Sequence, residues 1–428
     1  MMDLREKISE GRKLVESKNY VRVVSHHDVD GISAAAIITN NLRSQKKGFR
    51  CSLLKNVNGE LEEILAEDNE LLIVCDMGSS HIEAVEAAGR HVIILDHHQP
   101  IRESRSDMVL QINAHMHGIN GSAEACAATM AYAFAGDMNL ISFMISGALG
   151  DRQGTEFKGL NRKLVDEAVE KGIVKVSMGL TMDCYDRKNL QRIIASSMAP
   201  FFRGISGRDD RAKDVAKMLE GKSQKTVNSF LLSLLMDQGC REDVIDDLLG
   251  YTYSLPFMGL NSQELLSLLN VCDGFDMAEK GLAMALGDKA SYDEIVRQRD
   301  QYYKKALKGL VALEEKGATK MGALQYFHNE DLGMSGLYCG IGMRYILDQR
   351  LPAFVLTRTK DHLKVSARGT RYLINRGLNL AAAMRDAAEK CGGSGGGHDI
   401  AAGATLPLEN EKKFLEETER ILRGQLRL

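Results

Sequence analysis

Residues 21–31 read VRVVSHHDVDG, so a short apolar run is followed at once by two histidines and two aspartates. The same order returns at 71–76 (LLIVCD) and at 91–98 (HVIILDHH). Short apolar runs that alternate with helical patterns are typical of βαβ units and of a parallel sheet that is buried on both faces. We therefore expect an α/β fold here, with strands at 21–25, 51–54, 71–76 and 91–96 and helices at 31–46, 59–67 and 80–88.

The polar clusters lie where the predicted strands end, and functional residues of open α/β sheets gather beyond the carboxyl ends of the strands. Asp28 and Asp30 would face the same way in an extended segment, or a turn that begins at Gly31 would fan them around one ion. Carboxylate oxygens suit Mg²⁺ and Mn²⁺, and imidazoles shift the preference toward Mn²⁺. Because four carboxylates exceed the needs of one ion, we expect an ion pair that activates hydroxide and clamps a phosphoryl group. The residues of this hypothesis are Asp28, Asp30, Asp76, Asp96, His97, His98 and Asp151.

Composition narrows the class of protein. The chain has 428 residues, which indicates two or three domains, and its net charge of −3 argues against one large basic face. Its eight cysteines are scattered without a CxxC pair, so we expect free thiols in a reducing cytosol. The N-terminal 17 residues form a charged amphipathic pattern rather than a signal peptide, and no apolar run is long enough to cross a membrane. These features predict a cytoplasmic protein with no membrane partner.

The rest of the chain changes from helical to mixed patterns. Residues 123–300 are mostly helical in pattern, 292–317 predict one long connecting helix, and strand-like runs return after 320. Residues 341–376 hold eight basic residues and two acidic ones, and strand alternation would place Lys364, Ser366 and Arg368 on one face. The glycine-rich residues 391–405 predict a flexible loop that can approach an anion closely. Together these features indicate a groove for a polyanion.

Four motifs resemble those of the DHH phosphoesterase superfamily: SHHDVDG (25–31), CDMGSS (75–80), ILDHHQP (94–100) and GALGD (147–151). The stretch GGSGGGHDIAAGA (392–404), preceded by VSAR (365–368), resembles the DHHA1 substrate-binding domain that many members carry. Residues 199–207 (APFFRGISG) are similar to a segment of archaeal RecJ-like proteins. The resemblance implies a parallel-sheet DHH catalytic domain at 1–190, a helical middle segment at 191–318 and a smaller α/β DHHA1 domain at 319–428. It also implies an active site in the cleft between the two α/β domains.

The resemblance also implies a role for each matching residue. The implied metal ligands are His26, Asp28, Asp30, Asp76, His97 and Asp151, and Asp76 would bridge both ions. Asp96 would orient its neighbours and His98 would face the scissile phosphate, whereas His27 fills a variable position. The residues implied to hold the nucleic-acid end or its phosphate are Arg368, Gly395, Gly396, Gly397 and His398.

The activity that the resemblance implies is that of a single-strand exonuclease for DNA or RNA, with two Mn²⁺ or Mg²⁺ ions, in replication or repair. Its implied partners are single-stranded nucleic acid and either GINS or a repair helicase. Two alternatives stay open: a phosphodiesterase for short oligoribonucleotides or cyclic dinucleotides, and a replication-complex subunit that mainly binds GINS or a helicase. An inorganic pyrophosphatase ranks low because it shares the first motifs but not the glycine stretch.

Overall fold

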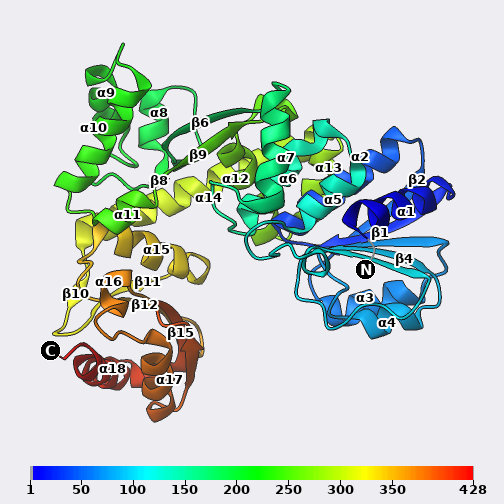
Figure 1. Cartoon of the computed structure of the whole chain (residues 1–428). Helices are drawn as coiled ribbons and strands as arrows, with labels where there is room; N and C mark the ends of the chain where they lie inside the picture. The colour runs from blue at the N-terminus through cyan, green and yellow to red at the C-terminus, as the bar shows by residue number, and fades with distance from the viewer. Residues whose placement is uncertain (1–2, 428) are drawn as a thin grey trace. The chain divides into compact units, whose positions relative to one another are not determined.

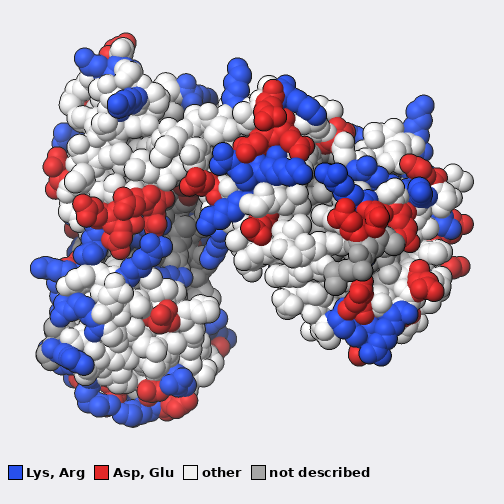
Figure 2. All heavy atoms as spheres, in the orientation of Figure 1, with Lys and Arg blue, Asp and Glu red and all other residues white. Residues whose placement is uncertain are grey.

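The computed structural model describes residues 3–427, and these residues form two compact units. The first unit comprises the described residues up to Thr181 together with Gly250–Arg299. The second comprises Met182–Leu249 and the described residues from Asp300 onward. Figure 2 shows that acidic and basic side chains are intermixed over the visible face of each unit, in keeping with the small net charge. Across residues 3–427, we find no helix with the length and apolar character that a membrane span requires.

The first unit is built on a five-stranded parallel sheet with the strand order β2-β1-β3-β4-β5. Its central strand β3 is fully buried, which explains the unbroken apolar run in the sequence. Helices α1, α2 and α5 cover one face of the sheet, and α3 and α4 cover the other (Figure 1). The strands are β1 (Tyr20–His26), β2 (Gly48–Leu54), β3 (Leu71–Cys75), β4 (His91–Asp96) and β5 (Val109–Asn113). The covering helices are α1 (Leu4–Glu16), α2 (Val29–Ser44), α3 (Val57–Ala66), α4 (Ile82–Ala87) and α5 (Ala127–Ala135).

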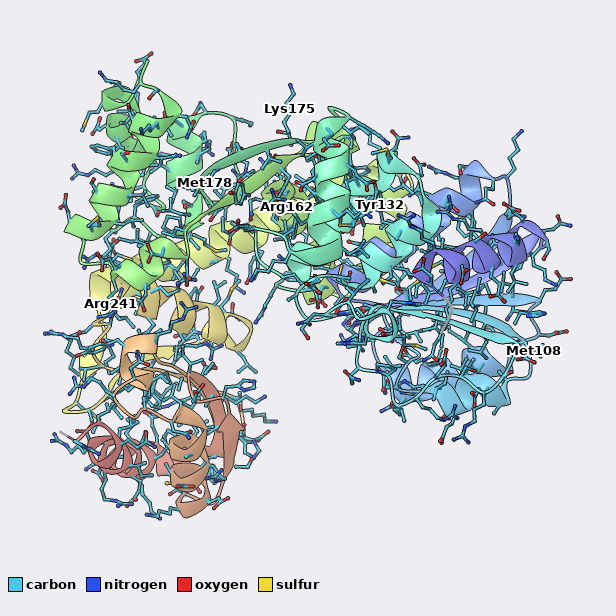
Figure 3. The ribbon with its side chains drawn as sticks, viewed as in Figure 1. Met108, Tyr132, Arg162, Lys175, Met178 and Arg241 are labelled. Atoms are coloured by element: carbon cyan, nitrogen blue, oxygen red, sulfur yellow. The ribbon has the colours of Figure 1, made fainter. Side chains whose placement is uncertain are left out.

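Further helices pack against α2 and enlarge the core of the first unit. Helices α6 and α12 both pack against α2, and α13 packs beside them. Strand β6, which follows α7 in the chain, pairs with the distant β9 in a two-stranded sheet, and α7 carries the exposed Arg162 (Figure 3). The bounds are α6 (Ile141–Gly150), α7 (Gly159–Glu170), β6 (Lys175–Leu180), β9 (Leu249–Ser254), α12 (Ser262–Gly274) and α13 (Ala278–Ala285). The expectation of a mostly helical middle segment therefore missed several short strands.

The second unit contains a six-stranded mixed sheet with the order β10-β11-β12-β13-β15-β14. Only β11 and β12 pair in parallel among its described strands. Helices α17 and α18 pack on the sheet around Phe354 and Phe414. The strands are β10 (Thr319–Lys320), β11 (Gln325–Asn329), β12 (Ala353–Arg358), β13 (His362–Arg368), β14 (Ser394–Gly397) and β15 (Ala401–Pro407). The helices are α15 (Ser335–Ile341), α16 (Arg371–Ile374), α17 (Leu380–Lys390) and α18 (Glu411–Leu426).

The helical part of the second unit consists of α8 to α11 and most of the long helix α14. The Arg241 guanidinium, just before α11, lies 4.5 Å from the centre of the Tyr372 ring, and this contact joins the helical part to α16 (Figure 3). The elements are β7 (Asp183–Cys184), α8 (Leu190–Ala195), β8 (Ser197–Ala199), α9 (Asp209–Met218), α10 (Gln224–Asp237), α11 (Glu242–Asp246) and α14 (Lys289–Lys316). The long helix expected at 292–317 is confirmed with slightly different bounds.

The prediction of a flexible glycine loop at 391–405 is wrong in its structure. Much of that stretch forms β14 and β15, which pair in antiparallel register. Glycine is needed at 395 because a Cβ there would lie 2.5 Å from the main-chain carbonyl oxygen of Met384 in α17. The missing side chains thus let α17 approach the edge strand closely, and the main chain is held in a ladder rather than free.

Candidate metal centre

The first motif forms the junction between β1 and α2. Asp28 is the N-cap of α2, and its Oδ1 accepts a hydrogen bond of 2.9 Å from the Gly31 N–H. Gly31 packs against the end of β1, so closely that a Cβ would lie 2.2 Å from the carbonyl oxygen of His26. Asp30 lies in the first turn of α2 and is buried. Of the two expected arrangements, the pair is therefore fanned by a turn, and this turn is the start of a helix.

Asp30 is fixed by a second helix. Its carboxylate accepts hydrogen bonds of 2.7 and 2.9 Å from the main-chain N–H groups of Ala127 and Ala128, at the start of α5. These donors and the positive end of the helix dipole stabilise a negative charge at this point. Gly147 of α6 leaves room beside it, because a Cβ there would lie 2.6 Å from Asp30 Oδ1.

The second and third motifs follow β3 and β4. Asp76 comes directly after β3 with a φ of 58°, a left-handed conformation that is uncommon for a residue with a side chain. Asp96 ends β4 and is fully buried, and its carboxylate accepts main-chain hydrogen bonds from Ser79, His97 and His98. It also lies 2.9 Å from Nδ1 of His98. Asp96 thus orients the turn that carries both histidines.

Three overlapping groups of side chains offer ligand atoms within 4.8 Å of one another. Asp76 belongs to two of the groups and His97 also belongs to two, so the groups form one continuous cluster. The groups are His26, Asp28 and Asp76; Asp30, His97 and Asp151; and Asp76, His97 and His98. The structure therefore brings together all six residues expected as metal ligands.

Two buried atoms in the centre of the cluster lack a hydrogen-bond partner. These are Oδ1 of Asp76 and Nε2 of His97, which lie 3.3 Å apart. A buried polar atom without a partner is costly unless another group satisfies it. A divalent cation would satisfy both atoms, and the carboxylate and imidazole donors match the preference of Mn²⁺ and Mg²⁺. The residues present therefore fit a metal centre.

Burial and neighbouring charges move the pKa values of the central groups. Burial raises the pKa of Asp30 to about 7, and the charge of Asp76 adds to this effect. Burial also raises the pKa of Asp76, although the neighbouring imidazoles of His26 and His97 oppose the change. The hydrogen bond with Asp28 raises the pKa of His26 to about 10. Because ligands must lose their protons to bind a metal, cation binding here is coupled to proton release.

The carboxyl groups around this centre have different environments. Burial disfavours the charged form of Asp96, but the hydrogen bond with His98 and the main-chain donors lower its pKa to about 2. Burial raises the pKa of Asp151 to about 6, and the charge of Asp30 contributes. Asp151 is the C-cap of α6 and lies 3.6 Å from Nδ1 of His97. The surroundings therefore favour the charged form of Asp96 and disfavour that of Asp151.

Residues that were not anticipated from the sequence orient His97. Its Nδ1 lies 2.7 Å from the carbonyl oxygen of Gly121, which fixes this nitrogen as the donor and leaves Nε2 facing the cluster. Gln153 donates to the same carbonyl and to Asp151, and Asn161 donates to Gln153. No sequence signal pointed to these roles, because neutral amides and a lone glycine have no charge pattern.

His27 points to a different partner. Its Nε2 lies 3.4 Å from Oδ1 of Asp273 in α12, and its ring packs edge-to-face on His26 with 4.7 Å between ring centres. Lys55 and Asp276 form an ion pair of 2.7 Å in the same region. Asp273 was not anticipated either, since it lies in a helical segment without a recognisable motif. These contacts attach the α12–α13 region to the β1–α2 junction.

The residues expected to bind substrate gather at one end of the sheet in the second unit. Arg368 ends β13 opposite Ala401 of β15, and Gly397 ends β14 opposite Ala402. The main-chain N–H of His398 donates to the carbonyl oxygen of Ala401. Lys364 and Ser366 lie on the same face of β13 as Arg368, as the alternation predicts. Along this face a 400 Å³ hollow is lined by Lys364, Ser366, Ser394, Gly395, Gly403 and Thr405, among others. Arg368, Gly396, Gly397 and His398 lie beyond this hollow.

Comparison with known proteins identifies both parts of the chain. Residues 20–149 match the model of the DHH family, N-terminal domain, and residues 333–424 match the DHHA1 domain. An uncharacterized protein of Methanocaldococcus jannaschii is 30% identical over 450 aligned positions, which cover the whole of both chains.

Solved structures with the same fold include RecJ exonucleases. Exonuclease RecJ bound to manganese superposes with a TM-score of 0.54 at 17% identity, covering 99% of this chain and 94% of that one. RecJ of Thermus thermophilus in complex with Mn²⁺ gives a TM-score of 0.52 at 17% identity. The match covers 98% of this chain but only 55% of the longer Thermus protein. CDC45 of Entamoeba histolytica gives 0.60 at 10% identity, covering 98% and 99% of the two chains. The chain therefore belongs to the DHH phosphoesterase superfamily, joins a DHH domain to a DHHA1 domain, and shares its fold with RecJ exonucleases.

Proposed function

We propose that this protein is a metal-dependent exonuclease that degrades single-stranded DNA or RNA, in replication or repair. The observation that carries the proposal is the continuous acidic and imidazole cluster in which Asp76 and His97 each belong to two groups. Shared ligands of this kind suit a pair of ions rather than one ion. The glycine- and arginine-lined end of the second sheet supports a substrate that carries phosphates.

In this proposal the residues of the first unit hold two Mn²⁺ or Mg²⁺ ions. His26, Asp28 and Asp76 would hold one ion, and Asp30, His97 and Asp151 would hold the other, with Asp76 as the proposed shared ligand. When bound, the ions supply a hydroxide near neutral pH and neutralise charge on a phosphoryl group. Asp96 has the orienting role, because it holds Nδ1 of His98 and leaves the other ring nitrogen free to donate to a phosphate oxygen. The pKa of His98 is raised by its hydrogen bond to Asp96, which favours the charged donor.

The second unit supplies the substrate-binding residues in this proposal. Arg368 and His398 would hold phosphates, and the backbone of residues 395–397 would approach the strand closely, since glycines have no side chains in the way. Such contacts read the backbone, so we expect little base preference. The division into a catalytic segment (1–190), a helical segment (191–318) and a substrate-binding segment (319–428) stays a proposal about function. So does the entry of the strand end into a cleft between the two α/β domains.

The decisive experiment compares substrates of different length. The protein is incubated with Mn²⁺ and a 30-mer labelled at its 5′ or 3′ end, as DNA and as RNA, and separately with dinucleotides. Progressive shortening of the single-stranded 30-mer, but not of a blunt duplex, is the expected result. Hydrolysis of dinucleotides alone would favour a phosphodiesterase for short substrates instead. Absence of any Mn²⁺-dependent hydrolysis would contradict the proposal that the protein is an enzyme. It would favour the alternative of a replication-complex subunit that mainly binds GINS or a helicase.

GINS and a repair helicase remain the candidate protein partners. An affinity-tagged chain, used as bait in a native extract with Asp76→Asn as the matched inactive control, would recover the partner with both forms. Activity measured on the recovered complex then tells whether the partner joins an active enzyme.

A further inference from the structure

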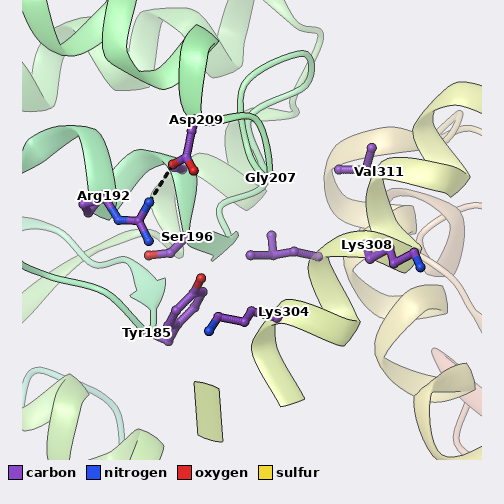
Figure 4. Close-up of a pocket in the computed structure, with 10 residues that line it drawn as sticks. Tyr185, Arg192, Ser196, Gly207, Asp209, Lys304, Lys308 and Val311 are labelled. Carbon is purple, nitrogen blue, oxygen red and sulfur yellow. Dashed lines mark hydrogen bonds and ion pairs between the residues drawn. The ribbon is translucent and has the colours of Figure 1, made fainter. Parts of the chain in front are cut away.

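A cavity of 280 Å³ lies in the helical part of the second unit, away from every residue assigned above. We call it the α8–α14 cavity, because its walls come from α8, the start of α9 and α14 (Figure 4). The residues that matter below are Tyr185, Arg192, Asp209, Lys304, Leu307 and Val311. The volume is near the lower limit of small-molecule sites, which span about 300–1,000 Å³. It is thus suited to one small chemical unit rather than to a folded partner.

One wall of the cavity carries a fixed guanidinium group. Arg192 donates from Nε to Asp186 and from Nη1 to Asp209, both at 2.8 Å. These two bonds come from different sides, so they hold the guanidinium plane in a single orientation. Figure 4 shows its edge turned toward Ser196 and Tyr185, which line the same space. A pre-oriented guanidinium is the group that binds oxyanions most specifically in proteins.

A second cation faces the same space without a carboxylate partner. The Nζ atom of Lys304 lies 5.8 Å from the centre of the Tyr185 ring and points toward it (Figure 4). Within residues 3–427, neither Lys304 nor Lys308 has a carboxylate oxygen within 4.0 Å. Asp186 and Asp209 are bound to Arg192, and burial together with the charge of a third carboxylate, Asp300, raises the pKa of Tyr185. Lys304 is therefore a cation in this space without a bound carboxylate, whereas Arg192 is held by two.

The opposite wall is apolar. Leu307 and Val311 of α14 line the cavity on this side. Lys308 stands between them in sequence, and its amine turns outward at the rim (Figure 4). A ligand for this cavity therefore combines an anionic group at one end with a flat or apolar body at the other. A nucleotide has both parts, and its sugar and base would lie along the apolar wall.

We propose that the α8–α14 cavity binds one nucleotide unit, with the phosphate between Arg192 and Lys304. This inference rests on the proposed function, since a nucleic-acid substrate makes phosphate rather than carboxylate the expected anion. The nucleotide is either a unit of the bound strand or a free mononucleotide, and both present the same phosphate and base. The site would add a contact outside the metal centre and outside the sheet end that carries Arg368.

The test measures binding in EDTA, so that the metal centre and its hydrolysis do not contribute. The probes are a fluorescein-labelled 12-mer of oligothymidylate, followed by anisotropy, and AMP, followed by calorimetry. Lys304→Gln is the test variant, because Lys304 is exposed and its removal breaks no ion pair. Lys213→Gln is the matched control, since Lys213 is an exposed lysine on α9 that does not line the cavity. Unfolding temperatures of all forms check that the fold is unchanged.

Lys304→Gln should weaken binding of the 12-mer about threefold to tenfold and reduce the slope of log K against log salt by about 0.7, the value of one phosphate contact. Lys213→Gln should leave both quantities unchanged. If the wild type binds AMP and Lys304→Gln does not, the occupant of the cavity is a free mononucleotide. If the substitution weakens binding of the 12-mer alone, the occupant is a unit of the bound strand. An equal loss of 12-mer affinity in Lys304→Gln and Lys213→Gln would overturn the proposal. So would a result in which a glutamate-rich peptide binds through Lys304 while neither the 12-mer nor AMP does.

These outcomes are separate from the fate of the proposed function. Hydrolysis by the wild-type chain with Mn²⁺ tests the exonuclease, whereas nucleotide binding in EDTA tests the cavity. A chain that hydrolyses a strand but shows no Lys304-dependent binding has lost only this inference. A chain that binds nucleotides through Lys304 but never hydrolyses them has lost only the exonuclease.

Discussion

Asp76→Asn is expected to stabilise the metal-free protein while abolishing its response to Mn²⁺. Asp76 is buried, with 2% of its side chain exposed beside His26, and burial raises its pKa. A carboxyl group whose pKa is raised by folding is less favourable in its charged form in the native state than in the unfolded state. Asparagine keeps the shape of the side chain and tolerates the left-handed backbone, so the substitution removes mainly the charge.

The size of this effect follows from the burial of the charge. An unsatisfied buried polar group costs about 1–3 kcal/mol, and Oδ1 of Asp76 has no hydrogen-bond partner. A gain of about 2 kcal/mol corresponds to roughly 4–8 °C in unfolding temperature for a unit of this size. The gain should grow as the pH rises above the ordinary carboxyl pKa, because only then is the wild-type carboxyl charged in the unfolded chain. In the wild-type protein, Mn²⁺ at 100 times its dissociation constant should add about 2.7 kcal/mol.

Asp28→Asn is the informative contrast, because it removes another proposed ligand with the opposite effect on stability. Burial raises the pKa of Asp28, but hydrogen bonds with His26 and Gly31 outweigh this and lower it to about 2. Its charge therefore stabilises the native state above the ordinary carboxyl pKa, and this contribution is lost as the pH falls toward 2. Since the side chain is 40% exposed, solvent screening keeps the loss below about 1 kcal/mol. Asparagine is an equally good N-cap, so the cap is retained.

The assay is thermal unfolding in EDTA and in Mn²⁺, at pH 6 and pH 8, for the wild type and both variants, with nuclease activity on the same samples. Both variants should lose the Mn²⁺-dependent rise and the activity, whereas in EDTA Asp76→Asn should unfold above the wild type and Asp28→Asn below it. The reasoning is refuted if Asp76→Asn lowers the unfolding temperature in EDTA, or if it keeps the full response to Mn²⁺.

The remaining predictions concern other positions. His398→Ala should raise KM for a labelled single strand more than it lowers kcat, and an effect on kcat alone would contradict a binding role. Gly31→Ala should cost about 1–3 kcal/mol, because its Cβ would clash with a main-chain carbonyl, whereas Ser33→Ala, which removes a buried hydroxyl without a hydrogen-bond partner, should be nearly neutral. Thermal unfolding distinguishes them, and equal losses would argue against the clash. Asp273→Asn should weaken Mn²⁺ binding by up to about tenfold in calorimetry by releasing His27, and unchanged affinity would show that their contact is only structural.

The parallel sheet could be predicted because its strands are buried on both faces. Burial of this kind leaves unbroken apolar runs, as in β3, and the runs alternate with helices that the same sheet requires. Strand β5 has no such run, since Gln111 interrupts it. The Gln111 side chain is buried, and its oxygen accepts a hydrogen bond from the main-chain N–H of Ser104. A polar residue in the strand thus provides the hydrogen-bond acceptor that a loop N–H needs. Such an exchange depends on tertiary contacts, which the local pattern does not contain.

The glycine stretch shows a different limit. Glycine is unfavourable in strands by propensity, so the residues of β14 favour a loop when they are considered alone. In the structure the glycines allow α17 to lie against the strand at a distance that any side chain at 395 would prevent. A strand forms here because α17 packs closely against it. The sequence shows only that these positions lack side chains, not that a helix packs there.

The cluster of carboxylates and imidazoles was predictable for the opposite reason. In a parallel sheet the strand ends meet at one edge, so charged residues that each follow an apolar run must come together whatever the loops do. Asp28, Asp76 and Asp96 could therefore be grouped from sequence, although the loops between them vary in length. Asp273 could not be added to this group from sequence, because it contacts His27 from the side of α12. The sequence of a helix does not indicate which of its faces will lie against the edge of a sheet. This difference implies that further functional contacts around the site will come from α12 and α13, and substitutions on the faces of those helices nearest the β1–α2 junction are where to look for them.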